Sequence, residues 1–242
     1  MKLLGVPASH PTLAAELMLR RKGIPYERRD LPNMSQRVVL PLLRLPAKTV
    51  PVLFADKRRV QGTTAIARYL DEIVPQPRLV PSDPRALELE AWADDVLQDN
   101  ARKLGQWAAK HDRSSLLEIA EASSIVLPKP LVRATMPVLG PAIMALIRVT
   151  DDDARRRLAE LPAHLDRVDA AIGAGVIGGD EPNVADYQVA TSVRLLTLIE
   201  QVRPFVERRP AGGLALRLVP DYPGRFEARF PAVWLEPLRA TD

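Results

Sequence analysis

A chain of 242 residues is long enough for one large domain or two smaller ones, and 47% hydrophobic with 26% charged residues is an ordinary globular composition. The net charge is +4 and the basic residues are spread along the chain, so we expect no nucleic-acid partner. Cysteine is absent, which excludes disulfides, thiolate metal sites and a thiol nucleophile belonging to the protein itself. The histidines lack metal-ligand spacing, so we expect no metal site. The apolar run before Pro11 is too short for a signal peptide, so we expect a cytoplasmic location.

The first eighty residues predict alternating strands and helices. Short apolar runs ended by proline or glycine indicate strands, and apolar residues at helical spacing indicate helices. The resulting order is βαβαββα, which packs helices on both faces of a small mixed sheet. The expected strands cover 2–6, 24–31, 50–54 and 58–60, and the expected helical segments cover 11–23, 35–48 and 63–73.

The composition changes after this unit. Four prolines fall within 75–84, and this stretch predicts a linker because proline removes an NH donor and favours extended backbone. Beyond it the strand signals end, and the expected helices cover 84–111, 150–175 and 184–202. The sequence therefore predicts an α/β plus all-α protein: an α/β domain over 1–76, a linker over 77–84 and an all-helical domain over 85–242.

The segment from Ser123 to Thr150 is rich in apolar residues and raises the question of a membrane. A spanning helix needs about 20 apolar residues without internal charges. Here Lys129 and Arg133 interrupt the run, and four prolines break it further. We expect no membrane span, and the segment predicts a kinked core helix or the wall of an apolar pocket.

Pro51 directly precedes the apolar run of a predicted strand. Proline cannot donate to a strand ladder, so it belongs at the first position or the edge of a strand. A sharper hypothesis is a cis Val50–Pro51 bond, which turns the backbone NH and C=O of Val50 toward a peptide-like ligand. Because only about 5% of X–Pro bonds in folded proteins are cis, these residues alone do not decide between the two.

Ser9 falls at the end of the loop between the first strand and the first helix. With Pro11 near the first helical position, Ser9 or Thr12 can simply be the N-cap, worth about 1 kcal/mol. The position is also the carboxyl edge of a sheet, where ligands of α/β folds tend to lie. A hydroxyl there can donate to a thiolate and lower its pKa from about 8.5. Adjacent side chains point apart, so we expect Ser9 rather than His10 to face a ligand.

Asn183 is followed three residues later by Asp186 and then by an apolar helix. The spacing is that of a capping box, with Asn in place of Ser or Thr and Asp in place of Glu. It predicts that a buried helix begins near Val184, and its role is structural.

Four short pieces, taken together, resemble the glutathione transferase superfamily over nearly the full length of the chain. They are Ser9-His10-Pro11, Val50-Pro51-Val52-Leu53, Gly62 to Leu70, and Asn183 to Tyr187. Their order and spacing, with the proline-rich stretch between the second pair, carry the resemblance. It implies a thioredoxin-like βαβαββα domain followed by a helical-bundle domain, paired as a homodimer.

The resemblance also implies glutathione as a co-substrate and assigns residues to it. Ser9 takes the position of the residue that activates the thiol, with Thr12 as the alternative. Thr63 and the NH groups at its helix start would receive the γ-glutamyl carboxylate. Val50, beside a cis Pro51, would pair with the cysteinyl backbone.

The remaining groups of glutathione fit less completely. Lys48 or Gln61 would reach the glycyl carboxylate. Gly62 departs from the superfamily's pattern, which usually carries an acid just before the hydroxyl. A partner for the α-ammonium of the ligand is therefore missing, which puts glutathione itself in question more than the fold.

The resemblance implies an enzyme that activates a small thiol and delivers it to a small electrophile, with most of the rate coming from a thiolate held near its target. The alternative is a non-catalytic binding or scaffolding module, because a fold does not determine a function. Gly62 favours that alternative. A membrane-associated isomerase of the same fold is a third interpretation, which rests on the apolar segment 123–149 alone.

Overall fold

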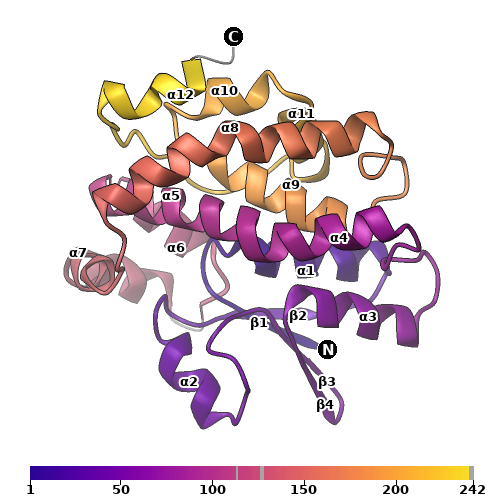
Figure 1. Cartoon of the computed structure of the whole chain (residues 1–242). Helices are drawn as coiled ribbons and strands as arrows, with labels where there is room; N and C mark the ends of the chain where they lie inside the picture. The colour runs from indigo at the N-terminus through magenta and orange to yellow at the C-terminus, as the bar shows by residue number, and fades with distance from the viewer. Residues whose placement is uncertain (113, 126–127, 240–242) are drawn as a thin grey trace.

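The computed structural model describes residues 1–112, 114–125 and 128–239. Its strands are β1 (Lys2–Gly5), β2 (Glu27–Asp30), β3 (Val52–Ala55) and β4 (Arg58–Gln61). They form one mixed sheet with the order β2-β1-β3-β4 (Figure 1). β1 runs parallel to β2 and antiparallel to β3, and β3 pairs antiparallel with β4.

Helices α1 (His10–Arg21), α2 (Gln36–Leu42) and α3 (Thr63–Ile73) complete this thioredoxin-like part, so the predicted βαβαββα order is confirmed. Ser9 caps α1, and Gly23, with a φ of 64°, follows its end, where glycine readily adopts the left-handed conformation. The apolar faces of the sheet, α1 and α3 meet in one core, which includes Leu3, Ala14, Met18, Leu19, Leu53, Ile66 and Leu70.

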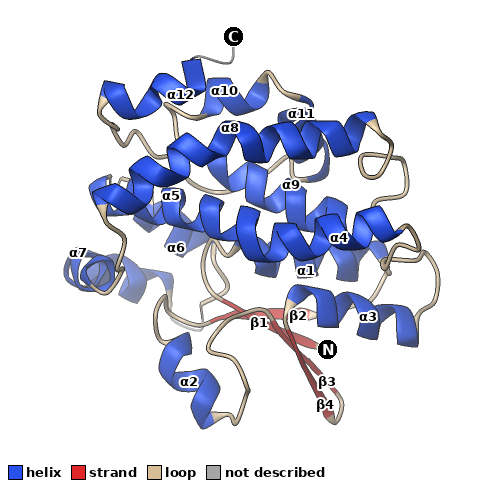
Figure 2. Ribbon diagram, viewed as in Figure 1, coloured by secondary structure: helices blue, strands red, loops and turns tan. Residues whose placement is uncertain are grey.

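The chain from Pro84 onward is mainly helical, as predicted (Figure 2). α4 and α5 form one long rod interrupted by a π-helical turn, η1. The elements are α4 (Pro84–Trp92), η1 (Ala93–Leu97), α5 (Gln98–His111), α6 (Leu116–Ala122), α7 (Lys129–Ala145), α8 (Asp151–Gly173), α9 (Val184–Leu196), α10 (Arg203–Glu207), α11 (Pro210–Leu218), the 3-10 turn η2 (Ala232–Leu235) and α12 (Glu236–Arg239).

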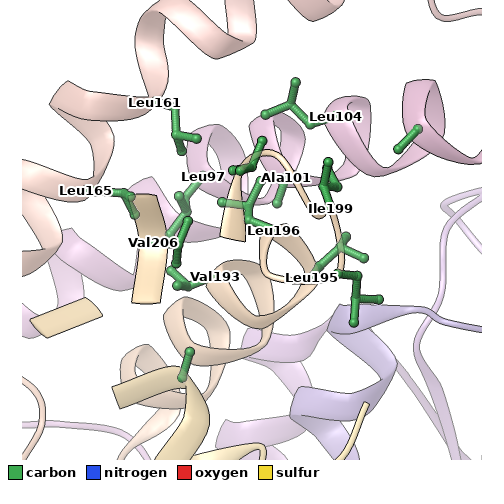
Figure 3. Packing of buried hydrophobic residues seen from close by; sticks show 14 of the residues in the cluster. Leu97, Ala101, Leu104, Leu161, Leu165, Val193, Leu195, Leu196, Ile199 and Val206 are labelled. Carbon is green, nitrogen blue, oxygen red and sulfur yellow. The ribbon is translucent and has the colours of Figure 1, made fainter. Parts of the chain in front are cut away.

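Helix α9 is the centre of the helical part. Its first residues, Val184 and Tyr187, pack into the core beneath the sheet, and Ala14 and Ala15 of α1 lie in the same cluster. Its later residues enter the core of the helical bundle, so α9 belongs to both cores. Figure 3 shows the bundle core around α5, α8 and α9, which includes Leu97, Ala101, Leu104, Leu161, Leu165, Val193, Leu196 and Val206.

The predicted helix over 184–202 is wrong at its C-terminal end, because α9 stops at Leu196. An isolated parallel bridge joins Ile199 to Phe226, and the N–H of Glu200 donates to the Phe226 carbonyl at 3.0 Å. These contacts with a distant part of the chain take the place of helical hydrogen bonds.

The apolar segment 123–149 is not a core helix, which corrects one of the two sequence expectations. α7 lies on the surface, and Val138 is 75% exposed. The opposite face of α7 lines a cavity of about 250 Å³ with Leu116 and Leu117 of α6, so the expected pocket wall is present. No helix within the described residues is long and apolar enough to cross a bilayer.

The proline-rich stretch between α3 and α4 is anchored to both parts of the protein. Leu79 is fully buried, and its N–H donates to Asp71 at 2.9 Å. The Leu79 carbonyl accepts a hydrogen bond from the N–H of Val184 at 2.9 Å. Asp71 also pairs with the buried Lys22 at 2.6 Å. We keep 77–84 as the proposed linker between domains at 1–76 and 85–242, and this linker is tethered.

Candidate functional site

Ser9 and Thr12 form the polar start of α1. The Ser9 Oγ accepts hydrogen bonds from the Thr12 N–H at 3.3 Å and from the Thr12 hydroxyl at 2.8 Å. Thr12 is fully buried, whereas Ser9 is half-buried. Since both bonds use Ser9 as the acceptor, the Ser9 hydroxyl keeps its own proton free to donate elsewhere.

Ser9 lines a cavity of about 630 Å³, which is bounded by α1, β2, α6 and the loop 221–223. His10 and Thr12 do not line it, and both are buried, at 4% and 0% exposed. Ser9 rather than His10 therefore faces this cavity, and the role of Ser9 toward a ligand stays a prediction. The alternative role of Thr12 as the activating hydroxyl is not favoured, because its side chain lies beneath Ser9.

The polar floor of this cavity is an ion-pair cluster that sequence reasoning missed. Arg28 on β2 donates from Nε to both carboxylate oxygens of Asp30 at 3.1 Å and also pairs with Glu16 on α1. The Tyr26 hydroxyl donates to Glu16 at 2.8 Å. Both buried carboxylates thus have a cationic partner, as buried charges require.

The wall of the cavity that α1 forms could have been predicted from the helical spacing of its residues. Ser9, Leu13, Glu16 and Arg20 line the cavity and recur at helical spacing along α1. Because Glu16 and Arg20 lie on the same face of α1 as Ser9, this spacing indicates both as cavity residues. The loop 221–223 gives no such signal, because it is more than two hundred residues away in the chain.

Tyr222 is the second hydroxyl near Ser9. Its O–H donates to the Ala8 carbonyl at 2.7 Å, and burial raises the pKa of Tyr222. Its proton is therefore committed to a backbone carbonyl, and its phenol stays neutral at physiological pH. Among these two cavity-lining hydroxyls, Ser9 is the one free to stabilise an anion.

A second group of sequence-predicted residues gathers where β3, β4 and α3 meet. The Val50–Pro51 bond is cis, which confirms that prediction. The N–H of Gly62 donates to the Pro51 carbonyl at 3.0 Å, and Thr63, only 3% exposed, begins α3. This group does not line the 630 Å³ cavity, so the predicted site residues form two clusters, with Ser9 in the cavity cluster.

Gly62 occupies a conformation that side chains avoid. Its φ is 93° and its ψ is 149°, and no heavy atom lies within 4 Å of the place where a Cβ would stand. Backbone geometry and not crowding therefore favours glycine here. An acid at position 62 would need a different backbone path into α3.

Gln61 is not free for a ligand, which weakens its sequence-based role. Its Oε1 accepts from the Ala47 N–H at 3.1 Å, and its Nε2 donates to the carbonyls of Ala47 and Thr49 at 2.8 and 2.7 Å. Gln61 thus holds the loop before β3 in place. Lys48 lies in that loop, is exposed, and makes no ion pair within the described residues.

Other ionisable groups do not complete the site. Asp99, the first candidate acid to stand in for a carboxylate at position 62, pairs with Arg102 and Arg157. Across 1–112, 114–125 and 128–239, no group of histidine and acidic side chains has the arrangement of a metal site.

Comparison with known proteins supports the fold. Residues 3–78 match the family model of the glutathione S-transferase N-terminal domain. The probable glutathione S-transferase GSTU6 of Oryza sativa subsp. japonica is 36% identical over 90 residues, which are 35% of this chain and 38% of that protein. Glutathione S-transferase U9 of Arabidopsis thaliana is 32% identical over 133 residues, which are 51% of this chain and 54% of that protein. The match thus spans about half, or less, of the length of these relatives.

The β-etherase LigF from Sphingobium sp. strain SYK-6 has a similar solved structure. Its TM-score is 0.62 at 15% identity, and the match covers 100% of this chain and 99% of that one. The fold is a thioredoxin-like domain followed by a largely helical part. Residues 3–78 belong to the glutathione transferase superfamily, and the whole chain has that superfamily's fold.

Proposed function

We propose that the protein is a glutathione transferase-like enzyme that activates a small thiol and conjugates it to a small electrophile. The observation that supports this most is the Ser9 hydroxyl, which lines the 630 Å³ cavity while Thr12 donates to its oxygen. A free thiol has a pKa of about 8.5. A hydrogen-bond donor at a helix N-terminus stabilises the thiolate and so lowers that pKa. The thiol proton leaves to solvent, the thiolate sulfur forms a C–S bond with the electrophilic carbon, and the leaving group, chloride in the case of an aryl chloride, departs with the electron pair of the bond that breaks.

Glutathione is the proposed thiol, laid along the cluster at β3, β4 and α3. Its γ-glutamyl carboxylate would meet Thr63 and the free NH groups of α3, and its cysteinyl backbone would pair with Val50. Lys48 is the better partner for the glycyl carboxylate, because the amide of Gln61 is already used. The homodimer and the cytoplasmic location that are common in the superfamily are part of this proposal.

One observation favours the alternative, a non-catalytic module with the same fold. Gly62 offers no carboxylate for the α-ammonium of glutathione. Loss of one charge-assisted hydrogen bond costs about 1.5–3 kcal/mol, or roughly ten- to a hundredfold in affinity. We therefore expect glutathione to bind weakly, with a Kd of about 1 mM.

Two measurements separate the candidates. Isothermal titration of the full chain with glutathione gives the affinity, and turnover of an activated aryl chloride gives the conjugation rate. Ser9→Ala should lower the rate about ten- to a hundredfold, and Ser9→Thr should restore part of it by returning a hydroxyl. Ser82→Ala, at an exposed serine of the proposed linker, is the matched control. Weak binding with no turnover by the wild type would favour the non-catalytic module.

A further inference from the structure

Helix α7 exposes an apolar stripe along its whole length. Leu131 is 47% exposed and Val138 75% exposed, and Leu146, which follows the helix, is 57% exposed. The small residues Ala134, Ala142 and Ala145 are exposed at matching helical spacing. Figure 1 shows α7 at the left edge of the view, outside the bundle of α5, α8 and α9.

The opposite face of α7 is apolar as well. Val132 and Met144 are 6% and 5% exposed, and Met136 lines the cavity beside α6. A helix of a soluble domain normally presents polar residues to water on the face that it does not bury. An exposed apolar stripe at i, i+3 and i+7 spacing marks an interaction surface.

The charges around the stripe indicate which surface it meets. Between Glu121 and Asp151 the sequence has no acidic residue, and Arg133 on α7 and Arg148 after it are both exposed. Arg133 is 63% exposed at its side chain and pairs with Glu121. Docking α7 on a second copy across a two-fold axis would set like charges against each other, whereas anionic lipid headgroups would complement them.

We propose that α7 docks the protein on an anionic bilayer, with the stripe of Leu131, Val138 and Leu146 lying among the headgroups. The helix lies in the plane of the interface and does not cross it. Pro137 and Pro141 stand inside α7 without breaking its course, and both border the cavity beside α6. This surface is separate from the cavity of Ser9, so the proposal stands whether or not the protein conjugates thiols.

Vesicle co-sedimentation of the full chain tests the proposal. Phosphatidylcholine vesicles with phosphatidylserine should pellet the wild type at least about tenfold more effectively than vesicles without it, and salt should weaken the binding. Val138→Glu should lower the binding about tenfold. Val233→Glu, at another valine that is 56% exposed, is the matched control and should bind like the wild type. Circular dichroism and the thermal midpoint confirm that both variants fold.

Four results would overturn the proposal. The wild type could fail to pellet with either vesicle, or Val138→Glu could bind as well as the wild type while folded. Sedimentation velocity supplies the third: if Val138→Glu converts a dimer to a monomer and vesicles bind neither form, a second copy covers α7. The fourth result is equal binding to both vesicle types, because it would show that the basic residues do not select an anionic bilayer.

Discussion

Thr12 donates its hydroxyl proton to the oxygen of Ser9 at 2.8 Å, and Gly5 makes room for Thr12 beneath the start of α1. A Cβ at Gly5 would stand 2.5 Å from the Thr12 methyl carbon. The pair therefore depends on glycine in the first strand. Because Ser9 accepts both of these bonds, its own hydroxyl proton is left for another group.

Thr12→Val should leave the fold intact but weaken the anion-stabilising role of Ser9. Valine has the shape of threonine without its hydroxyl, so Ser9 loses one of its two donors. One hydrogen bond is worth about 0.5–1.5 kcal/mol, which predicts a roughly three- to tenfold lower conjugation rate and a higher thiol pKa. The pH profile of conjugation measures both. Thr191→Val, at a fully buried threonine whose hydroxyl bonds within α9, should leave the profile unchanged.

Gly62→Ala should destabilise the protein by about 1–3 kcal/mol, because its φ of 93° disfavours every residue with a Cβ. Chemical denaturation by urea measures the free energy of unfolding. Gly213→Ala is the control: Gly213 lies in α11 with no heavy atom within 4 Å of a new Cβ, so alanine there should be neutral or stabilising by up to about 1 kcal/mol. Equal losses in the two variants would contradict the backbone argument.

Asp186→Ala should cost about 2–4 kcal/mol of unfolding free energy. The carboxylate accepts the N–H of Gly178 at 2.6 Å and the N–H of Asn183 at 2.9 Å, so its loss leaves two partly buried donors unpaired. Asp180→Ala, at an exposed acid two residues after Gly178, should change stability by less than about 0.5 kcal/mol. A small loss at Asp186 would mean that solvent replaces the capping box.

His10 should make the fold sensitive to acid. Burial, and next the charge of Arg102, lower the pKa of His10 to about 3, so the folded protein keeps it neutral. In the unfolded chain the imidazole takes up a proton at pH about 6.5. The contribution of neutral His10 to the free energy of unfolding is therefore complete above that pH and is lost as the pH falls toward 3. At pH 5 the loss is about 2 kcal/mol. Urea unfolding at pH 7.5 and at pH 5 measures how far the free energy of unfolding falls between the two. This fall should be smaller by that amount in His10→Asn than in the wild type, and an equal fall in both would contradict the prediction.

The local elements could be predicted from the sequence because their causes are local. The capping box of Asn183 and Asp186 is present as expected, and α9 begins at Val184. The strand at Val52 and the helix at Thr63 follow from short apolar runs and from helical spacing. Each of these features depends on residues within a few positions of one another.

The rest required contacts between distant segments. The C-terminal end of α9 depends on Phe226, and the cavity of Ser9 depends on Arg28 and on the loop 221–223. The sequence offers Gln61 to a ligand, whereas in the structure the amide of Gln61 already holds the loop at Ala47. A pattern of residue types does not show which hydrogen bonds are already made.

The double membership of α9 limits how this protein can evolve. Val184 and Tyr187 fill space beneath the sheet next to Leu79, while the rest of α9 builds the bundle. A helical part exchanged with that of another family member would bring different side chains to these positions and leave either a void or an overlap. The two parts are therefore not interchangeable modules, and substitutions on the facing side of α1 have to be matched on α9.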